Sequence, residues 1–160
     1  MAPPHRFLGV SPPSAGVEDY RPAMRSELLF LPALRARRAA LLAVPLTVAA
    51  GLGSRAFLGG LVAKMAGDAL YTVLLYVLVV VVRPAVRPSR AFAVSLGLSF
   101  AVELAQLTPY PAWLSSKHVI LRLIFGTTFG FVDLAGYVVG AILAVALHAL
   151  SRNALGRPPA

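Results

Sequence analysis

The chain has 160 residues, of which 58% are hydrophobic and 13% charged, and it contains no cysteine. Soluble domains are about 45–50% apolar and about 25% charged, so this chain has too few polar side chains to cover a globule, and a soluble enzyme is excluded. The net charge is +9, but the basic residues fall between apolar runs without interleaved aromatic side chains, which argues against nucleic acid as a partner.

The N-terminal third of the chain predicts a tail and a first membrane helix. Residues 1–33 contain six prolines and scattered charges without a long apolar run, which is typical of a flexible tail rather than a cleaved signal peptide. Residues 39–54 are apolar and predict a first membrane-spanning helix, which can extend back to Leu34 because arginine side chains reach the interface. Residues 67–82 form a nearly unbroken apolar run without alternation and predict a second.

Two further runs complete the predicted bundle. Residues 91–107 predict a third helix, and residues 126–150 predict a fourth. Between them, Trp113 and Lys117 are typical of a membrane interface, so we expect residues 113–125 to form an interfacial or re-entrant segment. The predicted fold is therefore all-α, an integral membrane bundle of four transmembrane helices with an extra segment before the last helix.

The distribution of basic residues predicts the orientation. We expect a cytoplasmic tail over residues 1–33, the membrane domain over residues 34–151 and a short cytoplasmic tail over residues 152–160. Of the 15 lysines and arginines, 11 precede the first apolar run, follow the last, or lie between the second and third. The other four lie in the two remaining connections: Arg55, Lys64, Lys117 and Arg122. By the positive-inside rule both termini are cytoplasmic, and these two connections face outward.

Three of the six acidic residues lie inside the predicted membrane helices, one in each of the last three: Asp68, Glu103 and Asp133. A charge at the bilayer centre costs about 2.5–3.5 kcal/mol on insertion scales, so such side chains normally face a bundle interior or a wet cavity. The predicted orientation puts all three near the outer face. Arg55 and Arg122 are expected at the same level and are the expected counter-charges.

Helical spacing adds further polar residues to these acids. On the third helix Ser95, Ser99, Glu103 and Gln106 form one polar stripe. Asp68, Tyr71 and Thr72 share a face of the second helix. On the fourth helix one face carries small residues that favour close packing, together with two polar ones: Gly126, Gly130, Asp133, Tyr137 and Gly140. The candidate ligand-binding residues are Arg55, Asp68, Tyr71, Glu103, Gln106, Arg122, Asp133 and Tyr137.

The order of these motifs resembles a known family. The pieces are Gly53-Ser54-Arg55, Gly67-Asp68-x-Leu70-Tyr71, Glu103-Leu104-x-Gln106-Leu107 and Asp133-Leu134-x-x-Tyr137-x-x-Gly140. Over residues 39–147 this pattern resembles the domain of unknown function 2809 family of bacterial membrane proteins. It is more distantly similar to the VanZ-like proteins, which usually have Asn where Tyr137 stands. The resemblance implies a multi-pass protein of the bacterial cytoplasmic membrane and carries over no activity.

These acids and arginines, which we call the polar cluster, have two possible interpretations. In the first, Arg55 and Arg122 hold the phosphate of a phospholipid or lipid-linked sugar phosphate, and the carboxylates bind hydroxyls. In the second, the cluster is a structural ion-pair network in a membrane scaffold or assembly protein. An enzyme, a proton-coupled transporter and a hard-cation site are less favoured, because no Ser-His pair is evident and the arginines oppose a cation. Membrane lipids are the expected partners, a homo-oligomer stays open, and no cofactor or metal is expected.

Overall fold

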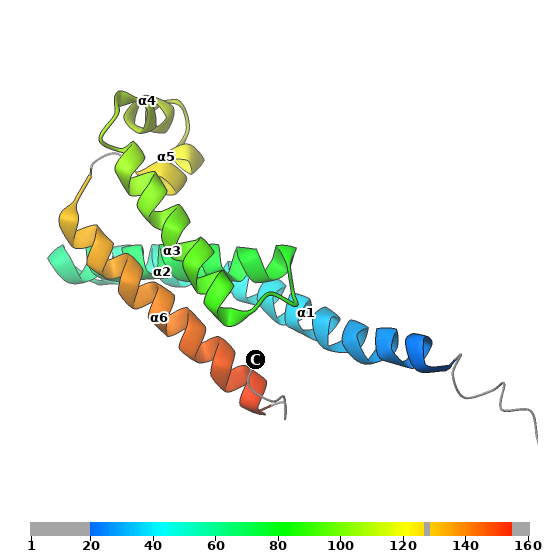
Figure 1. Ribbon diagram of the computed structural model, residues 1–160. Helices are drawn as coiled ribbons and strands as arrows, with labels where there is room; N and C mark the ends of the chain where they lie inside the picture. Colours follow the sequence, from blue (N-terminus) through cyan, green and yellow to red (C-terminus); the bar gives the residue numbers. More distant parts are fainter. Residues whose placement is uncertain (1–19, 127–128, 155–160) are drawn as a thin grey trace, which may run out of the picture. The chain divides into compact units, whose positions relative to one another are not determined.

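A computed structural model describes residues 20–126 and 129–154 of the chain (Figure 1). These residues form no strand, and their helices are α1 (Tyr20–Phe57), α2 (Gly60–Val82), α3 (Pro88–Ala105), α4 (Pro109–Lys117), α5 (Val119–Phe125) and α6 (Phe131–Ala154). Within this part of the chain three helices are long and apolar enough to cross a membrane, in the ranges Ala33–Phe57, Gly60–Val82 and Phe131–Arg152. The pair α3 and α4 adds a fourth span if the two count as one. The predicted all-α membrane bundle is confirmed.

The chain divides into two units between Pro32 and Ala33. In the first unit, the described residues are helical from Tyr20 onward and belong to the start of α1. Part of the segment that the sequence assigns to a tail is thus helical in the structure. Residues 1–19 and 155–160, the remainder of the two predicted tails, lie outside the described residues.

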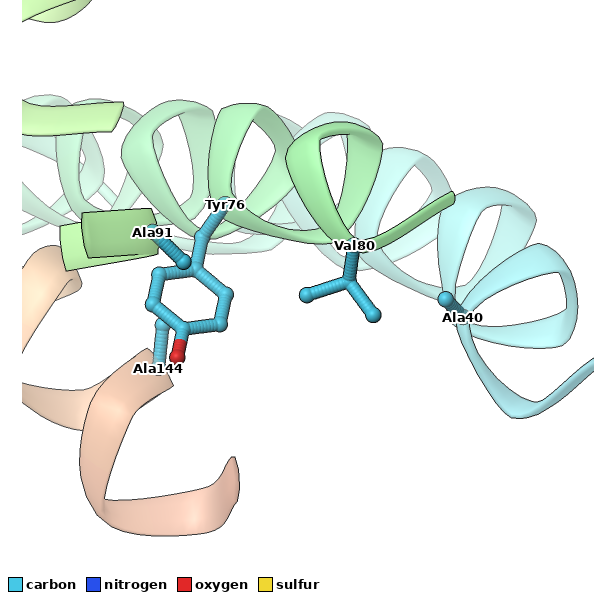
Figure 2. Close-up of a cluster of buried hydrophobic side chains, with 5 residues drawn as sticks. All are labelled: Ala40, Tyr76, Val80, Ala91 and Ala144. Carbon is cyan, nitrogen blue, oxygen red and sulfur yellow. The ribbon is translucent and has the colours of Figure 1, made fainter. Parts of the chain in front are cut away.

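In the second unit, α2, α3 and α6 pack against one another, and α4 packs against α5. The apolar centre lies where Tyr76 of α2 extends between Ala91 of α3 and Ala144 of α6, all three of them buried (Figure 2). Ala40 of α1 and Val80 of α2 continue this cluster. Most large apolar side chains outside it are exposed, which is the pattern of a bundle whose surface faces lipid.

Glycines set the distance between α2 and α6. A Cβ at Gly140 would overlap the backbone of Ala69, lying 2.8 Å from its Cα, and a Cβ at Gly136 would lie 2.8 Å from Cβ of Asp68. Real Cβ atoms do not approach other heavy atoms this closely, so these positions require glycine. Of the small residues predicted on the last helix, Gly140 therefore packs within the chain, and this close contact, together with Gly136, brings Asp68 of α2 toward the start of α6.

Two helix boundaries differ from the sequence-based prediction. The second helix begins at Gly60 rather than at residue 67, and Gly60 has φ +56°, a conformation that favours glycine. The last helix begins at Phe131 rather than at residue 126, because Gly126, with φ +63°, ends α5 instead. Gly126 and Gly130 therefore precede α6 and do not lie on its face.

The predicted interfacial or re-entrant segment corresponds to α4 and α5. The axis of α4 is bent by 95° from that of α3, and Thr108 and Pro109 form the junction. Proline at the first helical position needs no N–H partner, and its fixed φ suits the start of a new helix. The bend carries α4 and α5 past the end of α3, shown in yellow-green and yellow in Figure 1. As a result α5 lies beside the end of α3, where Gln106 donates a hydrogen bond to the carbonyl oxygen of Phe125.

Candidate functional site

The polar stripes predicted on α2 and α3 lie in the bundle interior. Thr72 of α2 and Ser99 of α3 are fully buried, and their hydroxyl oxygens lie 2.9 Å apart, within hydrogen-bond distance. One turn further along each helix lie the buried acids Asp68 and Glu103. Spacing of four residues along both helices therefore produces a polar seam between them.

Each carboxylate oxygen of Glu103 accepts a hydrogen bond. Its side chain is fully buried, with the backbone N–H of Gly130 donating to Oε1 at 2.5 Å and the hydroxyl of Tyr137 donating to Oε2 at 2.7 Å. Hydrogen bonds to an ionised group are about twice as strong as neutral ones, and a buried carboxylate needs them. We define Glu103, Gly130 and Tyr137 as the bonded cluster, which joins α3 to the start of α6.

Lys64 is the counter-charge of the other two acids. Its Nζ donates to Oδ1 of Asp133 and lies 3.8 Å from Oδ2 of Asp68. Both carboxylates are buried, whereas the Lys64 side chain is 47% exposed. Lysine at the edge thus neutralises two acids that belong to different helices, α2 and α6.

This pairing changes the expectation that Arg55 and Arg122 are the counter-charges of the acids: Lys64 is the near partner, and Arg55 acts on Asp68 only at longer range. In the described part of the chain, both ion pairs within 4 Å involve Lys64, and neither arginine has a carboxylate within that distance. The cause is the early start of α2, which places Lys64 one helical turn before Asp68. The four-residue spacing between Lys64 and Asp68 indicates this pair only if both residues lie on one helix, and the sequence analysis places Lys64 in a loop.

The two arginines instead line a cavity of about 740 Å³ between α1, α2, α5 and the end of α3. The guanidinium of Arg55 lies over Gly67, whose missing Cβ would be 3.3 Å from Nε. Most of the wall is aliphatic, and its polar or charged side chains are Arg55, Lys64, Asp68, Tyr71, Gln106, Arg122, Tyr137 and Thr47. Ligand pockets commonly have volumes of about 300–1,000 Å³ and combine apolar walls with a few polar groups.

Two buried acceptors of this wall lack hydrogen bonds. Among the described residues no donor reaches Oδ2 of Asp68 or Oε1 of Gln106. The amide nitrogen of Gln106 is occupied, since it donates to the carbonyl oxygen of Phe125 at 2.6 Å. An unsatisfied buried acceptor costs about 1–3 kcal/mol, so such groups in a native structure require an explanation. We define Arg55, Asp68, Gln106 and Arg122 as the open wall.

The eight candidate residues are thus divided by the structure. Six of them line the cavity: Arg55, Asp68, Tyr71, Gln106, Arg122 and Tyr137. Glu103 and Asp133 do not line it and are held by internal hydrogen bonds. Tyr137 belongs to both sets, and its ring lies 6.2 Å from that of Tyr71. Within residues 20–126 and 129–154 no group of three or more His, Asp or Glu side chains is arranged to hold a metal ion.

Two contributors were missed by the sequence analysis. Lys64 is the first. The second is Ser115 of α4, which is buried and donates from Oγ to the carbonyl oxygen of Gly126 at 2.5 Å. This bond fixes the end of α5 beside Gln106. A lone serine in a short segment carries no periodic signal, so its role depends on the bend between α3 and α4.

The comparison with known families gives a match over this region. The sequence model of the family described as "Protein of unknown function (DUF2809)" matches residues 57–141. The chain belongs to this family. The matched range includes α2 through the first half of α6, and with them the bonded cluster, Lys64 and most of the open wall. Comparisons with curated proteins and with solved structures gave no match.

Proposed function

We propose that this DUF2809 protein binds a membrane phospholipid in the cavity, with its phosphate between Arg55 and Arg122. The observation that carries the proposal is that both arginines line the cavity and that, among the described residues, neither has a carboxylate within 4 Å. Arginine binds phosphate through paired N–H donors, and the aliphatic wall suits acyl chains. The structural interpretation of the cluster explains Glu103 and Asp133, but among the described residues it gives neither arginine a carboxylate within 4 Å, and Arg55 is attracted to Asp68 only at longer range.

The proposal includes a location and an orientation. We place the protein in a bacterial cytoplasmic membrane with four spans, α3 and α4 counting as one, and with both termini in the cytoplasm. The proposal is supported by the distribution of the 15 basic residues, of which 11 lie in the terminal segments and the connection after α2, and four lie near the other two connections. The cavity then opens toward the head groups of the outer leaflet.

Cysteine labelling tests the orientation, and the absence of native cysteine gives a clean background. Gly59→Cys and Ser116→Cys change exposed positions and are expected to react with an impermeant thiol reagent added to intact cells. Ser89→Cys, an exposed position in the first turn of α3, is expected to react only after permeabilisation. The reverse pattern would contradict the orientation.

Native mass spectrometry tests the binding of phospholipid. The protein is extracted with its lipids and compared with the double variant Arg55→Ala/Arg122→Ala, which is expected to lose the retained phospholipid while its thermal midpoint changes little. The matched control is Arg87→Ala/Arg90→Ala, which removes the same charge from the opposite end of α3. Equal lipid retention by both double variants would contradict the proposal.

A further inference from the structure

The open wall offers acceptors as well as cations. Oδ2 of Asp68 and Oε1 of Gln106 are both buried without a donor, and both residues line the cavity. Lys64 does not fill this need, because its hydrogen bond goes to Asp133 and its Nζ lies 3.8 Å from Asp68. One lysine thus serves two carboxylates unequally, and Asp68 is left with the weaker partner. A ligand that brings hydrogen-bond donors to this side of the cavity would supply the partners that these two oxygens lack once the side chains turn toward it.

The balance of charge restricts the ligand further. The cavity wall contains three cations and one acid, Arg55, Lys64, Arg122 and Asp68, and the acids Glu103 and Asp133 lie behind it without lining it. When all six are ionised this group has no net charge, although its positive and negative members are separated. A ligand with no net charge and its own separated charges complements such a site better than an anion does.

We propose that the bound head group is a zwitterionic phosphoamine, of the kind found in phosphatidylethanolamine. Its phosphate lies between Arg55 and Arg122, and its ammonium donates to Asp68 and Gln106. An ammonium group supplies three donors and a positive charge, whereas a hydroxyl supplies one donor and no charge. The terminal torsion of an aspartate is broad and roughly two-fold, so rotation of Asp68 can turn its unpartnered oxygen toward the cavity. This assignment rests on the proposed function and specifies its ligand.

A set of three head groups tests the assignment on the wild-type protein. Delipidated protein in detergent is mixed with equal amounts of dioleoyl phosphatidylethanolamine, phosphatidylcholine and phosphatidylglycerol, and the bound species are counted by native mass spectrometry. Phosphatidylcholine keeps the positive charge without an N–H donor, and phosphatidylglycerol keeps hydroxyl donors without the charge. We expect phosphatidylethanolamine to be retained about tenfold over each of the others, the factor given by one additional charged hydrogen bond.

Variants locate the preference. Asp68→Asn removes the charge at nearly constant shape, and Gln106→Leu removes the second acceptor, so both are expected to reduce the tenfold preference toward equal retention. Thr47→Val is the matched control, since Thr47 lines the same cavity but its hydroxyl already donates to the carbonyl oxygen of Ala43 at 2.8 Å. This control is expected to keep the preference.

The outcomes separate the two proposals. Equal retention of the three lipids by the wild type, or an unchanged preference in Asp68→Asn, would overturn the phosphoamine assignment while phospholipid binding stands. Absence of any retained phospholipid, or full retention by Arg55→Ala/Arg122→Ala, would overturn the proposed function and the assignment with it. The wild-type comparison needs no variant to fold, so it decides the assignment by itself.

Discussion

The bonded cluster and the open wall each contain a buried acid, Glu103 and Asp68, yet they differ in how completely the hydrogen bonds of that acid are made. Both oxygens of Glu103 have donors, at 2.5 and 2.7 Å. Asp68, on the neighbouring helix, has a buried oxygen without one. A carboxylate whose oxygens both accept hydrogen bonds from the protein holds helices together and has no free acceptor for a ligand. The unfilled capacity of a buried acid, rather than its presence, indicates a binding site.

The largest expected effect comes from removing the acid of the bonded cluster. Glu103→Ala leaves the hydroxyl of Tyr137 and the N–H of Gly130 buried without an acceptor, so we expect the free energy of unfolding to fall by about 2–5 kcal/mol. Asp68→Ala strands no donor, because Lys64 keeps its bond to Asp133. We expect a loss below about 1 kcal/mol for that variant. Unfolding in mixed micelles measures both, and equal losses would break the comparison.

The second effect concerns the packing that brings the two regions together. In Gly140→Ala the added methyl group overlaps the backbone of Ala69, so α2 and α6 must separate. Overpacking of this kind costs about 1–3 kcal/mol, and the thermal midpoint in detergent should fall accordingly. Gly97→Ala is the control, because its Cβ would meet no atom within 4 Å on an exposed face of α3. Alanine favours helix there, and a lower midpoint for this control would contradict the argument.

The sequence predicts the bonded cluster more completely than the open wall. The two side chains of the bonded cluster, Glu103 and Tyr137, lie within continuous helices, where spacing of three or four residues decides which side chains share a face. The apolar composition around them also shows that a buried acid must face the bundle interior. Most residues of the predicted polar stripes on α2 and α3 are therefore buried in the structure, whereas Tyr71 and Gln106 are half-buried.

The open wall depends on features that periodicity does not contain. The start of α2 is set by a glycine of positive φ with no capping side chain, and this start moves Lys64 from a loop onto the helix beside Asp68. The partner of Gln106 is a backbone carbonyl of α5, which reaches it only because α4 turns by 95° from α3. Proline in the sequence marks the end of a helix but not the direction of the next one.

The third prediction sharpens the comparison by measuring pair energies. In a double-mutant cycle of Lys64→Met and Asp133→Asn we expect a coupling of about 1 kcal/mol, because these groups share a hydrogen bond at a partly buried site. The cycle of Arg55→Ala and Asp68→Asn is expected to show a weaker coupling than the first, since no ion pair within 4 Å joins these two residues and their charges attract only at longer range. Strong coupling in the second cycle would move Arg55 from ligand binding to structure.

The smallest effect is expected between the two regions, at the hydrogen bond of Thr72 and Ser99. Thr72→Val removes it at nearly constant shape, and Ser99 still donates to the carbonyl oxygen of Ser95 at 3.0 Å, so no donor is stranded there. Hydrogen bonds between membrane helices average about 0.6 kcal/mol in double-mutant cycles, and we expect a stability loss of this size. Retention of phospholipid should not change, because Thr72 does not line the cavity. A change in lipid retention without further loss of stability would mean that binding at the open wall depends on helix contacts one turn away, and the two regions would then act as one.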